Sequence, residues 1–351
     1  MKNVIRLEAQ AVVGVDLGDR SSQICRLDRE TGAILEQRRL STTSASFQRY
    51  FQGAPCLVIV ESGTHTPWVR RLLESLGHQV ITANPSKVQA ISSSLRKTDE
   101  RDARCLAQLA RVDPELLGPV HARSPEAQQA LAVVRAREGL VKVRTLLINQ
   151  VRGMVKSFGA RLPGCSSKSF ARGASEAIPQ ALKASLEPLL AVIADLSERI
   201  GVFDRDIEAW AQRFAVTQRL RQIKGVGALT SLVFVLTLDD PHRFARSRSV
   251  GAYLGLVPAS RNTGGSTPQL SITKQGDGLL RRLLVQAAHY ILGPFGQDSD
   301  LRSFGLELSR RGGKNGKKRA VVAVARKLAV LLHRLWISGE DYEPCRRPAA
   351  A

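Results

Sequence analysis

Residues 97–104 read Lys-Thr-Asp-Glu-Arg-Asp-Ala-Arg, and the predicted fold can be built outward from this stretch. Thr98 suits the N-cap of a helix, and the acidic residues behind it suit the positive end of the helix dipole. We therefore expect a helix that begins at Thr98 and runs towards Leu109. Asp99 and Asp102 are three residues apart on it, so their carboxylates share one face. Apolar residues extend that face, which predicts that both carboxylates point inward.

Two further carboxylates each close an apolar run. Asp16 follows Val-Val-Gly-Val at 12–15, and Glu61 follows Leu-Val-Ile-Val at 57–60. Runs of this length predict buried strands, whose next residue emerges at the carboxyl edge of the sheet. Each acid taken singly fits a helix cap or a surface salt bridge better than a site, but four together favour a site. Because divalent cations neutralise such a cluster, we predict four metal ligands: Asp16, Glu61, Asp99 and Asp102.

The charge balance predicts a polyanionic partner. The chain has 351 residues with 52 Lys and Arg against 31 Asp and Glu, a formal net charge of +21. No apolar stretch is long enough to span a bilayer, and residues 1–10 lack the apolar core of a signal peptide. We therefore favour nucleic acid over a membrane surface and expect a cytoplasmic protein. The five cysteines form no CxxC pair, which predicts reduced thiols and no zinc site.

The first third of the chain has the pattern of an α/β domain. Alternation and turn residues predict a three-stranded meander followed by a helix, a strand, a helix and a strand. The predicted strands cover 12–16, 22–27, 33–40, 57–61 and 79–82, and the predicted helices cover 47–51 and 68–76. This order, with acids at the ends of the first and fourth strands, resembles the RNase H-like fold of RuvC-type nucleases.

Local sequence words make the resemblance more specific. They are Gly14-Val15-Asp16, Val60-Glu61-Ser62-Gly63-Thr64, Asn84-Pro85, and Lys97-Thr98-Asp99 with Asp102-Ala103-Arg104. Together they resemble the DEDD transposases of bacterial insertion sequences, in the family numbered one hundred and ten, also called bridge-RNA-guided recombinases. The resemblance covers nearly the whole chain. It implies a RuvC-like DEDD metal-binding domain at 1–124, a helical coiled-coil region at 125–215 and a mostly α-helical C-terminal transposase domain at 216–351.

The middle region is predicted to contain two long helices. A basic amphipathic helix is expected over 127–158, and residues 159–179, rich in Gly, Ser and Pro, are expected to form a loop or hinge. A second helix carries apolar residues at alternating spacings of three and four over 193–214, which is a heptad seam. Two alternatives fit this seam: antiparallel packing of the two helices within one chain, or a coiled coil between two protomers.

The third region opens with a glycine turn. Lys224, Gly225 and Gly227 precede an apolar helix expected over 229–238. Two glycines in a tight turn between helices expose backbone N–H groups that can hold a phosphate, as in helix-hairpin-helix modules. A Gly-x-Gly pair is often only a turn. Its place ahead of Tyr253-Leu254-Gly255-Leu256-Val257-Pro258 favours phosphate binding, because that order resembles the C-terminal transposase domain of the family.

Residues 259–266 read Ala-Ser-Arg-Asn-Thr-Gly-Gly-Ser. In the family, a serine in this loop is the covalent DNA nucleophile, and the matching residue here is Thr263. Threonine has the same hydroxyl chemistry, with an added methyl group that crowds the attack. Three alternatives follow: Thr263 is the nucleophile, Ser266 replaces it, or strand exchange is impaired. We favour Thr263 and keep Ser260 as a further candidate, while a Ser/Thr/Gly-rich surface loop is the non-functional alternative.

Basic residues of the third region are predicted to contact nucleic acid. Residues 310–319 are expected to form a flexible basic run that leads into an apolar helix over 321–336, with a frayed end beyond Ile337. A charge run is usually a solvated face, but the net charge favours contact with a phosphate backbone. The full predicted set is Lys224, Gly225, Gly227, Lys274, Arg281, Arg282, Arg310, Arg311, Lys314, Lys317, Lys318 and Arg319.

These expectations combine into a transposase that cuts and rejoins double-stranded DNA with one or two Mg²⁺ ions. The resemblance further implies a structured non-coding RNA that pairs with target and donor DNA, and a homo-oligomer, either a dimer or a tetramer. Two alternatives remain: a RuvC-like structure-selective nuclease without a covalent intermediate, which the threonine at 263 supports, and an inactive nucleic-acid-binding remnant.

Overall fold

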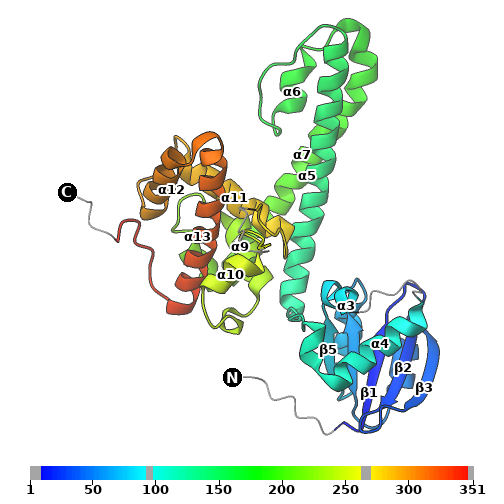
Figure 1. Ribbon diagram of the computed structural model, residues 1–351. Coiled ribbons are helices and arrows are strands. Elements are labelled where there is room, and N and C mark those ends of the chain that lie inside the picture. The colour runs from blue at the N-terminus through cyan, green and yellow to red at the C-terminus, as the bar shows by residue number, and fades with distance from the viewer. Residues whose placement is uncertain (1–8, 92–97, 262–269, 347–351) are drawn as a thin grey trace. The chain divides into compact units, whose positions relative to one another are not determined.

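The computed structural model describes residues 9–91, 98–261 and 270–346 (Figure 1). Thr263 and Ser266, the two predicted nucleophiles, lie outside the described residues. The chain divides into two compact units, Met1–Ala122 and Arg123–Ala351, which are considered separately. In the part of the chain that the structure describes, no helix is long and apolar enough to cross a membrane.

The first unit contains a five-stranded sheet in the order β3-β2-β1-β4-β5. β1 pairs antiparallel with β2 and parallel with β4, and the β2–β3 and β4–β5 pairs are antiparallel and parallel respectively. The predicted meander and the two later strands are confirmed within two residues at each end. The strands are β1 (Ala11–Asp16), β2 (Ser21–Asp28), β3 (Ile34–Ser41), β4 (Leu57–Glu61) and β5 (Gln79–Ala83).

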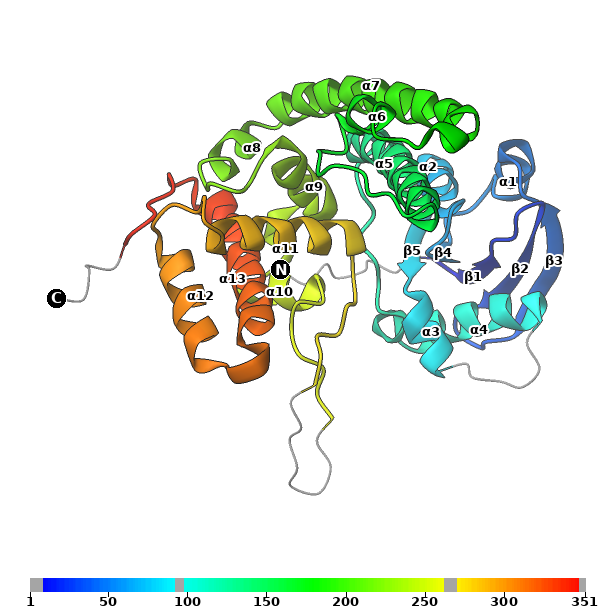
Figure 2. The ribbon, with the colours of Figure 1, turned by 90° about the horizontal axis from the view of Figure 1, so that it is seen from above.

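Helices cover both faces of this sheet (Figure 2). On one face, α1 (Ser44–Tyr50) and α2 (Thr66–Ser75) pack over a core that includes Val13, Val15, Val58 and Val60. On the other face, α3 (Pro85–Ile91) and α4 (Asp99–Val112) pack over Val12, Leu57 and Ile59. Successive side chains of a strand point to opposite faces, so β1 and β4 are buried on both sides, as their continuous apolar runs predict.

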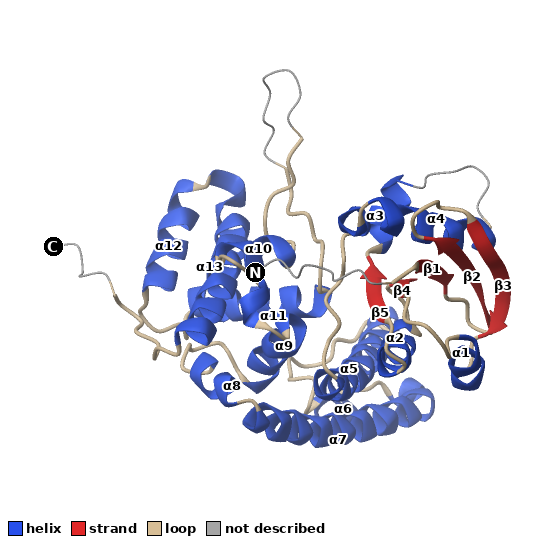
Figure 3. Cartoon of the chain, turned by 90° about the horizontal axis from the view of Figure 1, so that it is seen from below, coloured by secondary structure: helices blue, strands red, loops and turns tan. Residues whose placement is uncertain are grey.

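Among its described residues, the second unit is built from helices joined by loops (Figure 3). It begins with α5 (Pro125–Ser157) and α7 (Lys183–Arg213), which pack antiparallel. Val134 near the start of α5 shares a core with Ile207 near the end of α7, and Val155 shares another with Leu186. The heptad seam therefore packs within the chain, which is the first of its two predicted alternatives.

The segment 159–179 is not only a loop. It contains α6 (Phe170–Ser175), whose Phe170 is fully buried in the core shared by α5 and α7. Gly, Ser and Pro dominate this stretch and hide the short helix from sequence patterns. Burial of one aromatic ring supplies enough apolar area to fix a helix that its local propensity does not predict.

Six further helices follow among the described residues of the second unit. A single core joins them to the ends of α5 and α7 that lie away from α6. They are α8 (Ala215–Leu220), α9 (Ala228–Leu238), α10 (Arg248–Tyr253), α11 (Gly278–Leu292), α12 (Asp300–Arg311) and α13 (Gly316–Ser338). Short 3₁₀ turns lie at Pro114–Leu117 in the first unit and at Gln180–Leu182, Pro241–Arg243 and Gly313–Asn315 in the second.

The basic run 310–319 is ordered, in contrast to the flexible run that its composition predicts. It comprises the end of α12, one tight turn and the first residues of α13. The turn is tight because Gly312 lies against Gly316, and a side chain at Gly312 would meet the Gly316 backbone. Beyond α13 the chain is also tied down: Asp300 donates its backbone N–H to Pro344 O at 2.8 Å, and Tyr342 donates to the Gln222 side chain at 2.7 Å.

Candidate catalytic site and nucleic-acid surface

Asp16 and Glu61 end neighbouring parallel strands. The register pairs Val15 with Val60, so the two acids are the next residues along β1 and β4 at the same edge of the sheet. Asp16 is four residues after Val12 and Glu61 is two residues after Ile59, so each acid shares a strand face with that apolar residue. Both apolar residues face α4. Strand alternation therefore directs the two carboxylates to the α4 side of the sheet, where both are half-buried.

Helix α4 runs back along β1 from this edge. Gly14 lies directly against the α4 backbone, and a methyl group there would clash with Ala103 O and lie 2.7 Å from Ala107 N. At the other end of α4, Arg111 Nη1 donates to Glu30 O at 3.4 Å, in the β2–β3 turn. That turn lies beside the start of β1, because Ala11 pairs with Asp28. Helix α4 therefore begins towards the carboxyl ends of the strands.

The first turn of α4 carries the other two predicted ligands. Thr98 caps the helix by accepting a hydrogen bond from Arg101 N, which confirms the predicted N-cap. Asp99 is exposed, and Asp102 is half-buried immediately before Ala103, the residue that packs on Gly14. Within the described residues, no three His, Cys, Asp or Glu side chains form a group that could hold a metal ion. The donor chemistry suits Mg²⁺, which prefers carboxylate oxygens, and the four-ligand site stays a prediction.

The turn after β4 is held by one hydroxyl group. Thr66 Oγ1 donates to Glu61 O at 2.5 Å and accepts the Gly63 backbone N–H at 2.8 Å. Thr66 is 5% exposed, so these bonds form where water cannot replace them. They fix the strand end that carries Glu61. Sequence patterns indicate a turn here but do not single out Thr66.

A histidine lies at the same edge, on the α2 side. Trp68 Nε1 donates to His65 Nδ1 at 3.1 Å, so the neutral imidazole carries its proton on Nε2. His65 Nε2 lies 3.6 Å from an Asp19 carboxylate oxygen, and Asp19 is in the loop that follows β1. The loops after β1 and β4 are therefore linked through His65, beside the strand ends that carry Asp16 and Glu61.

A short antiparallel pairing joins the described residues on either side of the segment that contains the predicted nucleophiles. Pro258 bridges Ile272, with hydrogen bonds from Ala259 N to Ser271 O at 2.9 Å and from Thr273 N to Val257 O at 3.0 Å. Such a pairing holds the two ends of a loop in fixed positions. The described residues on either side of Thr263 and Ser266 are thus anchored.

Two predicted nucleic-acid contacts have partners inside the protein. Arg281 Nη1 donates to Leu254 O at 2.9 Å and to Gln275 O at 2.8 Å, so it clamps the base of the paired segment. Arg282 forms an ion pair with Glu138 of α5. A side chain already engaged in this way has less freedom to bind phosphate, although Arg282 remains about half exposed.

The glycine turn has the geometry that the sequence predicts. Gly225 has φ +99°, a conformation that favours glycine, and it packs against Tyr290. Gly227 is the N-cap residue of α9, and a side chain there would meet nothing within 4 Å. The turn thus joins two helices, α8 and α9, as the sequence predicts. Lys224 is exposed beside it, so contact with phosphate stays a prediction.

The remaining predicted cations lie on the surface of the second unit. Lys274 is exposed with φ +56°, and Arg310, Lys317, Lys318 and Arg319 are exposed near the α12–α13 turn. Arg311 pairs with Glu307 one turn back on α12. Lys314 lies within the turn itself. The predictions did not include four exposed cations, one on α10 and three on α13: Arg248, Arg326, Lys327 and Arg334. The regular spacing of the cations on α13 could have indicated a basic helix face. The apolar residues between them were interpreted only as a core helix.

Comparisons with known proteins agree over most of the chain. Residues 13–159 match a family described as transposase, and residues 217–298 match one described as "Transposase IS116/IS110/IS902 family". A transposase for insertion sequence element IS1111A from Coxiella burnetii is 30% identical, over 94% of this chain and 91% of its own. A probable family 20 transposase from Pseudomonas aeruginosa is 31% identical, over 96% and 98%. A transposase for insertion sequence element IS1328 from Yersinia enterocolitica is 31% identical, over 79% and 82%.

These relatives align along the chain through both compact units. One matched region contains the strand ends with Asp16 and Glu61 and the first turn of α4, and the other contains the glycine turn and the paired segment around Thr263. The matched ranges thus span both parts of the candidate site, and the chain belongs to the IS110 family of DNA transposases.

Proposed function

We propose that this transposase cleaves and rejoins DNA strands with a divalent-metal centre on Asp16, Glu61, Asp99 and Asp102. The observation that carries the proposal is the register of β1 and β4, which makes Asp16 and Glu61 neighbours on the face that α4 covers. The α4 acids directly precede the Gly14–Ala103 contact, which holds this part of α4 against β1, the strand that ends in Asp16.

The four carboxylates would hold one or two Mg²⁺ ions, which stabilise the charge that develops on a phosphate during strand cleavage. The protein's own contribution is positioning. Thr66 holds the strand end at Glu61, and the Thr98 cap fixes the first turn of α4. Rigid strands and helices orient reacting groups better than free loops, which lowers the entropy cost of reaching the transition state.

A hydroxyl group would carry the strand-exchange step. The oxygen of Thr263, or of Ser266, forms an ester bond to the phosphorus, the bond to one sugar oxygen breaks, and that sugar oxygen takes up a proton. The reverse attack by a sugar hydroxyl rejoins DNA and releases the protein. The Pro258–Ile272 bridge supports this assignment because it holds the described residues on either side of the segment together.

Separate Thr263→Ala and Ser266→Ala variants test the nucleophile. A labelled DNA junction is incubated with protein, and covalent protein–DNA adducts are counted on a denaturing gel. We expect Thr263→Ala to abolish the adduct while Ser266→Ala keeps it. Loss of recombination with cleavage retained in both variants would instead support a nuclease that uses water.

An Asp102→Ala variant tests the metal centre. We expect it to lose cleavage while it binds DNA like the parent, because the carboxylate would hold the metal ion at the reacting phosphate and the proposed binding surface lies elsewhere. Recombination at the parent rate would remove Asp102 from the proposed site. Titration with Mg²⁺ in the parent protein supplies the matching measurement, since activity must then depend on divalent cations.

We also propose a guide RNA and an oligomeric assembly, either a dimer or a tetramer. The support is the resemblance to bridge-RNA-guided recombinases, together with a net charge of +21, which suits two polyanionic partners. Recombination in cells that carry the gene with and without its flanking non-coding DNA tests the RNA. Equal recombination with and without the flanking DNA would contradict a guide RNA. So would target sites that stay the same when the sequence of the RNA loops is changed. Light scattering with and without that RNA tests the assembly.

A further inference from the structure

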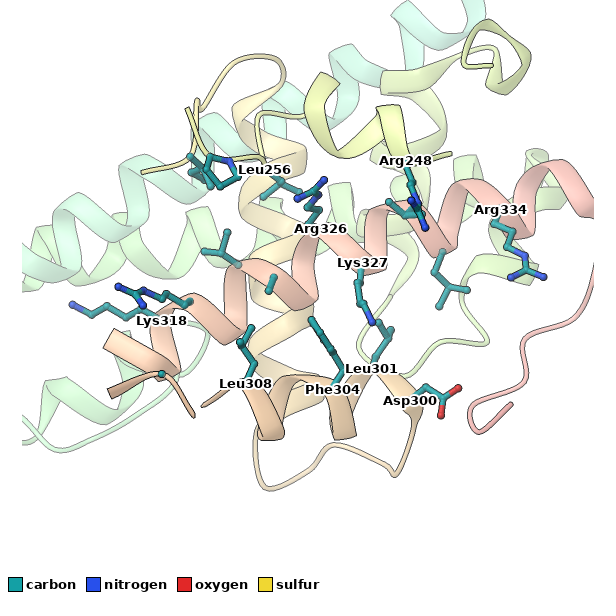
Figure 4. A pocket seen from close by; sticks show the side chains of 18 of the residues that line it. Arg248, Leu256, Asp300, Leu301, Phe304, Leu308, Lys318, Arg326, Lys327 and Arg334 are labelled. Atoms are coloured by element: carbon teal, nitrogen blue, oxygen red, sulfur yellow. The ribbon is translucent and has the colours of Figure 1, made fainter. Parts of the chain in front are cut away.

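A groove of about 1260 Å³ runs along α13 in the second unit (Figure 4). Its walls come from α10, α12, α13 and the chain that follows α13. Pro258, Ser271 and Ile272 also line it, and these residues form the paired base of the segment that contains Thr263. The groove therefore reaches the described residues on either side of the segment that is predicted to react with DNA.

On the face of α13 that lines the groove, arginines repeat about every two turns, with apolar residues between them. Arg319, Arg326 and Arg334 lie seven or eight residues apart, and Val322 and Val330 lie between them. A helix rises 1.5 Å per residue, so these cations repeat about every 11 Å along one face. Such a row presents evenly spaced positive charges with short apolar steps between them.

The groove as a whole is strongly basic. Eight Lys or Arg residues line it, against two carboxylates. Among the described residues, Arg248, Arg319 and Arg326 form no ion pair. Arg334 lies 3.9 Å from Glu340, with both side chains about half exposed, and such a pair contributes little. A concave surface with this imbalance attracts a polyanion.

The opposite wall of the groove is apolar. Leu301, Phe304 and Leu308 of α12 line it, and Figure 4 shows Phe304 and Leu308 directed towards α13, with Lys327 beside Phe304. The Lys327 ammonium lies 3.6 Å from the centre of the Phe304 ring, which holds this cation at the wall. An occupant that satisfies both walls needs phosphates on one side and flat apolar surfaces on the other.

We propose that this groove binds a single-stranded segment of DNA. Its phosphates lie on the α13 arginines and its bases lie against the apolar wall of α12. Duplex DNA fits less well, because its base faces are stacked inside the helix and the apolar wall would stay uncovered. A second copy of this chain fits poorly on charge, since each copy carries +21. Strand exchange produces unpaired DNA strands, so the groove would guide one of them towards the Pro258–Ile272 bridge.

The choice of DNA as the occupant rests on the chain's membership of the DNA transposase family and on the proposed strand exchange. The binding itself depends neither on the proposed metal centre nor on the proposed nucleophile. It can therefore be measured on the full-length protein without divalent cations, and its failure leaves the cleavage and adduct tests untouched.

The experiment compares an Arg319→Gln, Arg326→Gln double variant with a Lys142→Gln, Arg205→Gln control. The control removes the same charge from exposed positions on α5 and α7, outside the groove. Binding of labelled oligodeoxythymidine is followed by fluorescence anisotropy across a salt series, and urea unfolding verifies that both variants fold like the parent. Because each contact to single-stranded phosphate contributes about 0.7 to the salt slope, we expect the groove variant to lose about 1.4 and the control to keep the parent slope.

Three competitors identify the occupant. We expect an abasic oligonucleotide of equal length to bind the parent at least about tenfold more weakly, because it keeps the phosphates and lacks stacking bases. We expect a duplex competitor to be weaker than the single strand. Equal slopes in groove variant and control, equal binding of the abasic strand, or preference for duplex would each overturn the proposal. A tenfold preference for RNA of the same sequence would assign the groove to RNA, and a changed oligomeric state with unchanged DNA binding would assign it to a second copy.

Discussion

Thr66 shows how one hydroxyl group positions a candidate catalytic residue. Its two hydrogen bonds tie the turn after β4 to the carbonyl of Glu61. A Thr66→Val change keeps the shape and removes both bonds, so we expect a loss of stability of about 1–3 kcal/mol. We also expect cleavage to fall further than DNA binding, because a positioning loss of about 1.4 kcal/mol slows a reaction about tenfold.

The matched variant for this position is Thr66→Ser, which keeps the hydroxyl and should restore the cleavage rate. The readout is the rate of DNA cleavage at saturating DNA, together with the Mg²⁺ concentration that gives half of the maximal rate. If Thr66→Val loses stability while both of these quantities stay at the parent values, Thr66 supports only the fold.

Gly14 allows α4 to lie directly on β1. A methyl group there would clash with the backbone at Ala103, and a backbone atom cannot rotate away as a side chain can. We expect Gly14→Ala to destabilise the protein by at least about 1–3 kcal/mol and to abolish cleavage, because α4 must move away from Asp16. Urea unfolding measures the first effect. Gly139→Ala in α5, where a side chain would meet nothing within 4 Å, is the control and should be neutral or stabilising.

His333 gives the second unit a pH dependence. Burial lowers the pKa of its imidazole below the ordinary value of a histidine. Its Nε2 donates to Pro241 O at 2.9 Å, and Nδ1 lies 3.0 Å from Ser247 Oγ. Because the unfolded state binds the proton more readily, this group contributes stability that is fully present above about pH 6.5 and is lost as the pH falls below it.

The measurement is the free energy of unfolding as a function of pH, in the parent and in His333→Gln. Glutamine can still donate to the Pro241 carbonyl but does not titrate. We expect the parent to lose more stability than the variant between about pH 7 and pH 5. Parallel curves would show that His333 does not carry this dependence.

Sequence patterns identified the individual acids of the candidate site but not the residues that hold them in place. Asp16 and Glu61 end strands whose apolar runs are unmistakable, so their shared edge followed from the pattern alone. The hydrogen bonds of Thr66 and the close packing of Gly14 depend on contacts between residues far apart or on the shape of one turn. No periodicity reports such contacts, which is why these two residues were not predicted.

Among the elements, Arg281 links the paired segment to α11. Its guanidinium bridges the carbonyls of Leu254 and Gln275 and therefore holds the start and the end of the segment together. We expect Arg281→Lys to reduce adduct formation more strongly than it reduces DNA binding, because a lysine ammonium does not reproduce the planar fork of arginine. Adduct yield and anisotropy on the same DNA measure the two effects. An equal fall in adduct yield and DNA binding would indicate that Arg281 contacts nucleic acid directly, as the sequence analysis predicts.

Elements were predicted best where one pattern decides them. β1, β4 and α4 begin and end within a few residues of their predicted bounds, because buried runs and a capping threonine mark them clearly. α6 and the ordered turn between α12 and α13 were not predicted. In both cases a glycine-rich composition indicates a loop, while long-range packing of Phe170 and the contact of Gly312 with Gly316 determine the structure.

On the scale of the whole molecule, the two compact units have separate cores. The cores of the first unit, on the two faces of its sheet, draw their residues from 9–117 alone. The cores of the second unit begin at Ala127 and draw nothing from the sheet. A unit that contains its own core has most of the buried apolar surface that it needs to fold by itself.

We therefore expect residues 1–122 and 123–351 to fold when they are produced separately. Each fragment should unfold cooperatively in urea, and its circular dichroism should match its share of helix and strand. A Gly14→Ala change should lower the stability of the first fragment alone, and a His333→Gln change should alter the pH dependence of the second fragment alone, because each residue packs within its own unit. A first fragment that stays unfolded while the full chain is stable would show that the sheet depends on contacts with the helical unit.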